Sequence, residues 1–255
     1  MKIDYAISLW NYTHYTNAPS LERILAQVRE AGYGIELWGD WRDEKDLYDE
    51  TGRQRLGAAL QGMRVSLHTA GANTFDLHKK QVDAAADLGA EVLVLHPDDL
   101  YVKGAPRTLD AALANQVVDY ARTAGIRLAL ENGQLPFLIK ARDQVEGLYF
   151  CLDVGHVYLT TAPMSAFLDA LKHRLVHLHL QDLAPEAAKT LRFPGTGIDH
   201  YALGAGGIPE QDWRLLFATL EEINFEGTAV FELQPWNPLQ TAWMGRAFVA
   251  QFTQA

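Results

Sequence analysis

The sequence predicts an α/β fold, a single (β/α)8 barrel, and three observations carry this prediction. The chain has 255 residues, close to the usual length of one such barrel. Eight short apolar runs recur along it, separated by amphipathic segments, which is typical of strands and helices alternating around a parallel sheet. The first run leads into Ser8-Leu9-Trp10-Asn11 and not into the glycine-rich loop of an open doubly wound sheet. We therefore expect one domain over residues 1–255.

The predicted strands are the apolar runs themselves, each of a length that one strand of a barrel needs. In chain order they are Ile3–Leu9, Gly34–Trp38, Arg64–His68, Glu91–His96, Arg127–Glu131, Leu148–Asp153, Leu175–Leu180 and Thr228–Leu233.

The segments between the runs predict helices, because their apolar residues recur three or four positions apart. Gly32, Gly89 and Gly125 fall where a helix gives way to the next strand, as a left-handed C-terminal cap requires. Residues 182–209 are rich in glycine and proline and predict a long loop on the catalytic side, suited to covering a substrate. The clearest helical segments are Leu21–Ala31, Gln81–Leu88, Leu109–Ala124, Ala166–Lys172 and Trp213–Ile223.

The net charge of the chain bears on its possible partners, and its cysteine content bears on the compartment in which it works. Lys and Arg number 22 against 32 Asp and Glu, so the chain carries a formal charge of −10, which disfavours nucleic acid as a partner. The one cysteine, Cys151, cannot form a disulfide within the chain, which suits a reducing compartment. There is no signal-like N-terminus and no apolar stretch of membrane-spanning length. We expect a cytoplasmic protein with no membrane partner.

Ionisable residues end seven of the eight predicted strands. Parallel buried strands are normally apolar throughout, so each such residue needs a reason. Any single one is more often a cap or an ion-paired group, but the carboxyl ends of all strands in a closed barrel meet at one rim, where active sites form. Packing several acids and imidazoles together is unfavourable unless a cation compensates them. The residues are Glu36, His68, His96, Glu131, Asp153, His179 and Glu232, with His177 on the same face as His179.

Four of these residues form a hard, oxygen-rich ligand set. Three carboxylates and one imidazole suit one divalent cation, Mn²⁺, Mg²⁺ or Co²⁺, with Zn²⁺ also possible. Trp10, Trp38 and Phe75 are candidates to wall the pocket with flat apolar surfaces, although aromatic side chains more often belong to the core. The candidate ligands are Glu131, Asp153, His179 and Glu232.

Several motifs in this pattern resemble the xylose-isomerase-like barrels. They are Gly34-Ile35-Glu36-Leu37-Trp38, Leu130-Glu131-Asn132, Leu152-Asp153-Val154-Gly155-His156, His177-Leu178-His179-Leu180-Gln181-Asp182 and Phe231-Glu232-Leu233. This group includes sugar epimerases of the tagatose-epimerase type, hydroxypyruvate isomerases, inosose dehydratases and DNA repair enzymes of the endonuclease-four type.

The resemblance implies that the four candidate ligands hold the metal and that His156 contacts substrate or a metal-bound group. It also implies that Glu36 helps to organise the pocket, with a structural ion pair as the alternative. We therefore expect the substrate to meet His156, His68, His96, Glu36, Trp10 and Trp38.

The chemistry favoured by these residues is isomerisation or epimerisation of a small sugar, sugar phosphate or hydroxy-ketone. Removing a proton beside a carbonyl gives an enediolate, whose charge a divalent cation stabilises while carboxylates act as acid and base. Glu131 and Glu232, from opposed sides of the barrel, are the expected acid/base pair as well as ligands, as the epimerase resemblance also implies. No lysine ends a strand, which disfavours a hydride shift of the xylose-isomerase kind.

Three alternatives stay open at this point: a zinc phosphodiesterase of the apurinic-site endonuclease type, an inosose-type dehydratase and a non-catalytic ligand-binding barrel. His68, His96 and His200 match additional zinc positions of the endonuclease branch. That branch has an aspartate two residues before the last histidine, whereas this chain has Ile198 there and Asp199 out of step by one. A complete three-metal site is therefore not expected.

Two further groups of residues are candidates for contacts with an anionic substrate and for an interface. Four basic residues are candidate contacts for an anionic substrate: Arg42, Lys103, Arg107 and Arg192. Three aromatic residues near the C-terminus could form the interface of a homo-oligomer or pack the last helix on the barrel: Trp236, Trp243 and Phe248.

Overall fold

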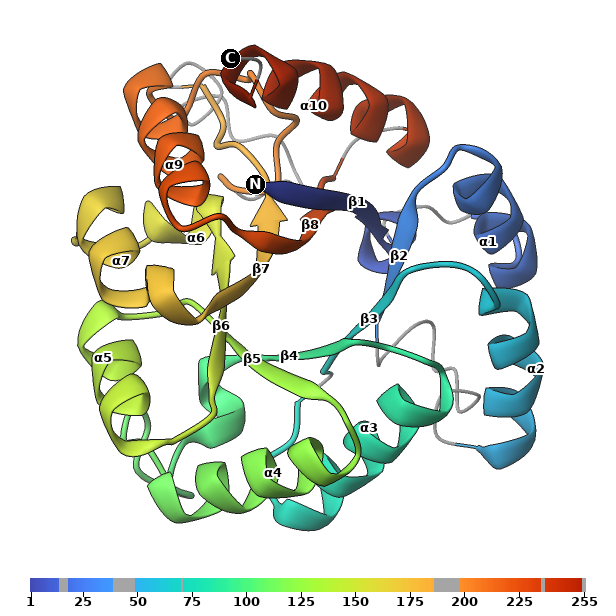
Figure 1. Cartoon of the computed structure of the whole chain (residues 1–255), viewed down its shortest axis with the longest axis vertical. Coiled ribbons are helices and arrows are strands. Elements are labelled where there is room, and N and C mark those ends of the chain that lie inside the picture. Colours follow the sequence, from blue (N-terminus) through green and yellow to red (C-terminus); the bar gives the residue numbers. More distant parts are fainter. Residues whose placement is uncertain (14–17, 39–48, 70, 186–197, 235–236, 254–255) are drawn as a thin grey trace.

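A computed structural model describes residues 1–13, 18–38, 49–69, 71–185, 198–234 and 237–253. Eight parallel strands follow one another in chain order around a closed barrel, and the last pairs with the first. Figure 1 shows the helices as a ring outside the strands. The predicted (β/α)8 barrel is confirmed.

The strands lie close to their predicted bounds. Three of them, β2, β5 and β7, have the predicted bounds, while β4 and β8 each end just before an expected site residue, His96 and Glu232. The strands are β1 Lys2–Ser8, β2 Gly34–Trp38, β3 Val65–His68, β4 Val92–Leu95, β5 Arg127–Glu131, β6 Tyr149–Asp153, β7 Leu175–Leu180 and β8 Glu226–Phe231.

Several helices between the strands begin at a side chain that caps them. Ser20, Thr74 and Asp110 each accept a hydrogen bond from a backbone N–H of the first helical turn that follows. The α-helices are α1 Leu21–Glu30, α2 Glu50–Leu60, α3 Phe75–Asp87, α4 Ala111–Thr123, α5 Leu135–Gln144, α6 Val154–Val157, α7 Met164–Leu171, α9 Glu210–Glu222 and α10 Pro238–Thr253; the 3₁₀ helices are η1 Leu9–Tyr12, η4 Pro97–Leu100 and η5 Lys172–Arg174.

Helices α2, α5, α6 and α10 were not among the clearest segments expected from the pattern, and α3 was expected too short. Helix α2 buries only Gly52, Leu56 and Leu60, so its apolar stripe is thin. Helix α5 carries a proline in its first turn, where proline is tolerated because that N–H has no partner within the helix. Helix α3 begins six residues before the expected Gln81 because Thr74 caps it. Gly32, Gly89 and Gly125 have φ of 76°, 71° and 75°, as expected of left-handed caps.

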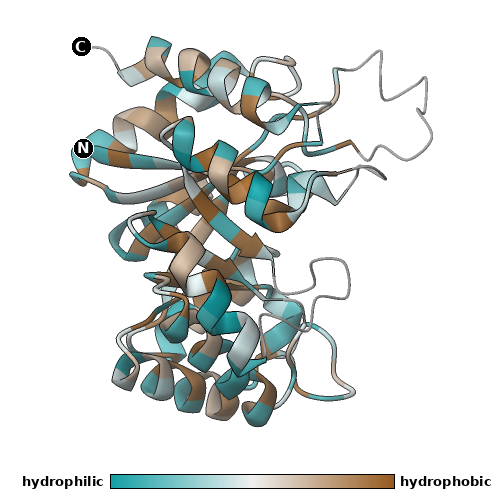
Figure 2. Ribbon diagram, turned by 90° about the vertical axis from the view of Figure 1, so that its right-hand side faces the viewer, coloured by the Kyte–Doolittle hydropathy of each residue, from teal (hydrophilic) through white to brown (hydrophobic). Residues whose placement is uncertain are grey.

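The core is divided by the barrel wall. A large apolar cluster fills the space between strands and helices, and a small one of Val92, Val94, Ala129, Cys151 and Val176 fills the lower barrel. In β7, Leu178 and Leu180 belong to the outer cluster. His177 and His179 alternate with these leucines along the strand and therefore point inward. In Figure 2, which colours the ribbon by hydropathy, much of the strand ribbon is brown and the helices around it are of mixed colour. Above the small cluster the barrel interior is polar.

No helix in the described part of the chain is long and apolar enough to cross a membrane.

Candidate metal centre and active site

The four candidate ligands converge at the carboxyl ends of β5 to β8. Glu131 and Asp153 end β5 and β6, His179 lies in β7, and Glu232 follows β8. The Nδ1 atom of His179 lies 2.9 Å from Glu131 Oε1, 3.1 Å from Glu232 Oε2 and 3.8 Å from Asp153 Oδ2. One ligand atom from each residue lies within 4.8 Å of the others, and all four side chains are buried. The structure thus brings together the set expected from the sequence.

The charges of this centre are unbalanced. Three buried carboxylates surround a single imidazole, and the ion-pair partners of Glu131 among the described residues are all histidines. Burial raises the pKa of Asp153. Burial would also raise the pKa of Glu131, but His156 and His179 outweigh it and hold that pKa well below its usual range. An oxygen-rich, anionic pocket of this kind fits a hard divalent cation.

Glu36 contacts His179 at Nε2, the ring nitrogen that does not face the other three candidate ligands. Its Oε1 lies 3.1 Å from His179 Nε2, while Oε2 lies 2.9 Å from His177 Nε2 and accepts a hydrogen bond from Ser66 Oγ at 3.0 Å. A carboxylate behind a metal-binding histidine fixes the ring and the nitrogen that faces the ion. Glu36 lies at Nε2 of His179, whereas the other carboxylates lie at Nδ1, so its position favours orienting His179 over touching substrate.

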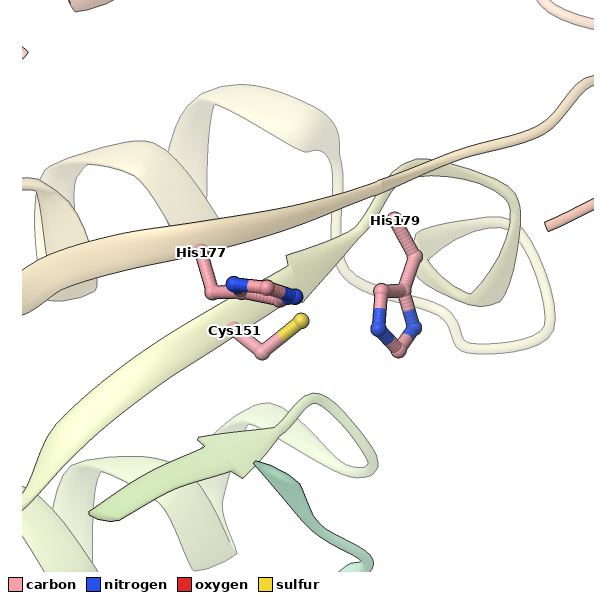
Figure 3. A group of neighbouring side chains, drawn as sticks. All are labelled: Cys151, His177 and His179. Atoms are coloured by element: carbon pink, nitrogen blue, oxygen red, sulfur yellow. The ribbon is translucent and has the colours of Figure 1, made fainter. Parts of the chain in front are cut away.

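Cys151 lies in the same lower layer. Figure 3 shows its sulfur beside the rings of His177 and His179, and all three side chains are fully buried. Burial raises the pKa of the Cys151 thiol far above its ordinary value. The cysteine is therefore a neutral packing residue at the floor of the site.

His68 and His96 form one wall of the site. Their Nε2 atoms lie 4.0 Å and 3.6 Å from Glu131 Oε2, and their ring centroids lie 4.5 Å apart. Trp38 packs on His68 with a centroid separation of 4.4 Å. These contacts bring His68, His96 and Trp38 together and place two imidazoles beside the carboxylate of Glu131.

Asp99 was not expected, and it ties the two strands that carry this wall. Its carboxylate accepts hydrogen bonds from Thr69 Oγ1 at 2.6 Å, Ala72 N at 2.6 Å and His96 N at 3.0 Å. The residue lies in η4, outside the strand-end positions that drew attention in the sequence. The sequence signal was the pair Asp98-Asp99 directly after the fourth strand.

A second cluster lies at the rim and consists of His156, Asp199 and His200. Asp199 Oδ2 lies 3.6 Å from His156 Nε2 and 3.7 Å from His200 Nε2. Burial would lower the pKa of His156, but Asp153 and Glu131 outweigh it and raise that pKa well above its usual value. Trp10 packs on the ring of His200, with centroids 4.4 Å apart.

Asp199, one position out of step with the endonuclease pattern, still lies beside His200. The backbone of His200 is left-handed, with φ of 60°, so the chain turns sharply between the two residues. The turn puts both side chains on His156 despite the one-residue offset. The residue types of a second ligand set are therefore present together.

The remaining expected residues fall elsewhere. Phe75 packs edge to face on Tyr120, with ring centroids 5.9 Å apart, as part of the core. Phe248 packs on Trp213, whereas Trp243 is 67% exposed on α10. Lys103 and Arg107 lie between η4 and α4. Arg42, Arg192, Trp236 and most of the expected substrate-covering loop lie outside the described residues.

The family follows from a comparison with known sequences. A model of the family described as xylose isomerase-like TIM barrel matches residues 25–244. The chain belongs to this family. The resemblance that rested on motifs around Glu131, Asp153, His179 and Glu232 is thus confirmed at the level of the family.

Relatives and solved structures within this fold carry several activities. An inosose dehydratase of Glaesserella parasuis serovar 5 (strain SH0165) is 29% identical over 118 residues, which make up 42% of this chain and 39% of the relative. The chain thus matches about two-fifths of the length of such curated relatives.

Two solved structures share the whole barrel. The IOLI protein with a binding zinc atom has a TM-score of 0.75 at 15% identity and 98% coverage of both chains. A D-allulose 3-epimerase from Methylomonas sp. in complex with D-allulose has a TM-score of 0.70 at 20% identity, covering 98% of this chain and 97% of that one. At such identities the likeness shows the fold alone.

Proposed function

We propose that this protein is a divalent-metal-dependent isomerase or epimerase of a small sugar, sugar phosphate or related hydroxy-ketone. The observation that carries the proposal is the convergence of Glu131, Asp153, His179 and Glu232 within 4.8 Å at the active rim of the barrel. Family membership and the D-allulose bound by a structural neighbour support the substrate class.

The four residues would hold one hard cation, Mn²⁺, Mg²⁺ or Co²⁺, with Zn²⁺ as the alternative. A bound cation would act as a Lewis acid that stabilises the negative charge of an enediolate. His179 and Asp153 would mainly hold the ion, and Glu36 would keep His179 Nδ1 aimed at it from 3.1 Å behind the ring. This assigns Glu36 to positioning and not to substrate contact.

Glu131 and Glu232 would transfer the protons. They lie on β5 and after β8, on two sides of His179, at 2.9 Å and 3.1 Å from its Nδ1. One carboxylate would remove the proton beside the carbonyl, leaving its electron pair in the enediolate, and the other would pass a proton taken up from solvent to the enediolate from its own side. Delivery to the other face of the same carbon would give an epimer, and delivery to the neighbouring carbon, with the hydroxyl proton passing between the two enediolate oxygens, would give an isomer.

The substrate would lie between the His68 and His96 wall and the cluster at the rim that contains His156. His68, His96 and Trp38 line one side, and His156 lies with Trp10 on the other. Imidazoles offer hydrogen bonds to hydroxyl groups, while the indole faces cover the apolar C–H surface of a sugar. No nucleic acid partner is proposed, because the chain carries a charge of −10.

A substrate screen in D₂O tests the function. The protein reconstituted with Mn²⁺ is offered ketoses, their epimers, inososes and small hydroxy-ketones, and each mixture is followed by NMR. We expect deuterium to enter beside the carbonyl of at least one substrate, together with its epimer or isomer. Deuterium entry followed by loss of water would show a dehydratase. Absence of exchange across the whole panel would contradict the proposal.

The second candidate is a zinc phosphodiesterase of the endonuclease type. The His156, Asp199 and His200 cluster favours it, because these side chains meet at a site that could hold a further ion. His68 and His96 beside Glu131 offer a third position. Metal analysis separates the two functions, since one ion per chain supports the isomerase and two or three zinc ions support the phosphodiesterase.

A further inference from the structure

Gln181 joins the metal centre to the rim cluster. It follows β7 directly and its side chain is fully buried. Its Nε2 donates to Asp153 Oδ2 at 2.7 Å, and its Oε1 accepts from the backbone N–H of His200 at 2.5 Å. The amide nitrogen of Gln181 therefore contacts the candidate metal centre, and its amide oxygen contacts the backbone of the rim cluster.

Gly155 provides the space that Gln181 occupies. A Cβ built on Gly155 would lie 2.4 Å from Gln181 Oε1 and 2.5 Å from its Cδ, much closer than side-chain atoms approach. Gly155 belongs to α6, whose first turn is capped by Asp153. The glycine of the Asp153-Val154-Gly155-His156 turn is therefore needed for the amide to reach Asp153.

The contacts leave Asp153 little freedom to turn. Its Oδ1 accepts from His156 N at 2.8 Å while Gln181 holds Oδ2, the atom that faces His179. Because an amide group is planar and rigid, a shift of the His200 backbone at one end of Gln181 displaces the donor to Asp153 at the other. Asp153 orientation and the placement of His200 are thus linked through one side chain.

The base of the loop that carries His200 is held independently. The Asp182 carboxylate accepts from the backbone N–H groups of Leu183 at 2.7 Å, Ile208 at 2.8 Å, Gly204 at 3.0 Å and Gly206 at 3.1 Å. Removing the Gln181 amide therefore leaves the loop anchored and changes only the alignment of Asp153 and His200.

We propose that Gln181 is a positioning residue that sets the geometry of both clusters at once. The inference rests on the proposed metal centre. Partners that orient metal ligands typically contribute about 10- to 100-fold to metal affinity. Gln181 would contribute through Asp153, and the same side chain would hold His200 beside Asp199 and His156.

Two variants that disturb the amide by different routes test this proposal. Gln181→Met keeps a similar side-chain volume and removes both hydrogen bonds, and Gly155→Ala pushes an unchanged Gln181 away. Gly57→Ala is the matched control, because a Cβ there would meet its nearest neighbour, Asp87 O, at an ordinary 3.6 Å. The measurements are the Mn²⁺ dissociation constant by calorimetry and hydrogen exchange at the His200 amide in the metal-free protein by NMR.

We expect Mn²⁺ binding about 10- to 100-fold weaker in both variants, as for other partners of metal ligands, together with faster exchange at His200. Gly57→Ala should match the wild type in both readouts. Wild-type affinity in both variants, or unchanged exchange at His200, would overturn the role of Gln181 while leaving the metal centre in place. A wild-type protein that binds no divalent cation would overturn the proposed function and this inference with it.

Discussion

Both ends of the barrel carry charged residues, but the two ends differ in how deeply these residues are buried and in how their charges are paired. At the amino ends of the strands, Arg64 lies 3.0 Å from Asp4 and 2.7 Å from Glu91, and Arg127 lies 3.4 Å from Glu91. These side chains are about one-third to one-half exposed, and their charges are matched in pairs. At the carboxyl ends, three carboxylates are buried around His179.

This difference teaches that charge at a strand end is not by itself a sign of function. Exposed ion pairs are solvated and contribute little, so the amino end needs nothing further. Buried acids in excess of their cationic partners are unfavourable until a cation joins them. Burial and charge balance therefore distinguish the proposed active end of the barrel from the opposite end, and variants at both ends can test this.

Loss of either proposed acid/base residue should have the largest effect. We expect Glu131→Gln and Glu232→Gln to reduce solvent-deuterium exchange of the substrate by roughly 10²- to 10⁴-fold, the usual contribution of a positioned acid or base. Glu91→Gln, at the opposite end, should exchange as the wild type does. Exchange that survives in both active-end variants would remove the acid/base assignment.

Metal binding should stabilise the fold through the active end only. An ion at 100 times its dissociation constant adds about 2.7 kcal/mol, which raises the melting temperature of a chain of this size by roughly 5–10 °C. Differential scanning calorimetry with and without Mn²⁺ measures the shift. We expect Asp153→Asn to lose it and Arg64→Met to keep it. A shift that persists in Asp153→Asn would place the ion elsewhere.

Glu36 provides a sharper test, because it is fully buried and contacts the far ring nitrogen of His179. We expect Glu36→Gln to weaken Mn²⁺ binding about 10- to 100-fold, since the carboxylate no longer orients His179. Ser66→Ala removes one hydrogen bond from Glu36 and should have a smaller effect in the same direction. Unchanged metal affinity with a raised KM would instead show that Glu36 contacts substrate.

The smallest effect should come from the amino end. Arg64→Met breaks the exposed pairs with Asp4 and Glu91, and we expect a loss of about 1 kcal/mol or less in the free energy of unfolding. The loss should shrink further in high salt, which screens exposed charges. Urea unfolding at two salt concentrations measures both. A loss of several kcal/mol would contradict the view that these pairs are minor.

Much of the barrel and of the ligand set could be predicted because both depend on patterns that are local in sequence. Each strand is an apolar run, and parallel strands in a closed barrel bring all their carboxyl ends to one rim. Glu131, Asp153, His179 and Glu232 had to lie near one another once the barrel was accepted. Helix α2 was missed because its buried stripe is short, and α5 because its proline resembles a helix breaker.

The rest of the site depends on distances that no pattern in one sequence encodes. The depth of Glu36 below the ligands follows from strand register, and the approach of Asp199 follows from the left-handed backbone of His200. Gln181 and Asp99 act through hydrogen bonds to partners far along the chain. The roles of such side chains can be recognised only from a structure that shows which residues they contact.

Crystals soaked in Mn²⁺ and measured at the manganese absorption edge test the central claim most directly. We expect one strong anomalous peak whose distances to Glu131, Asp153, His179 and Glu232 all fall within about 2.0 to 2.6 Å, the range for hard divalent cations. No peak should appear between Arg64 and Glu91. The absence of a peak among the four residues, at a concentration that saturates the protein in solution, would contradict the account.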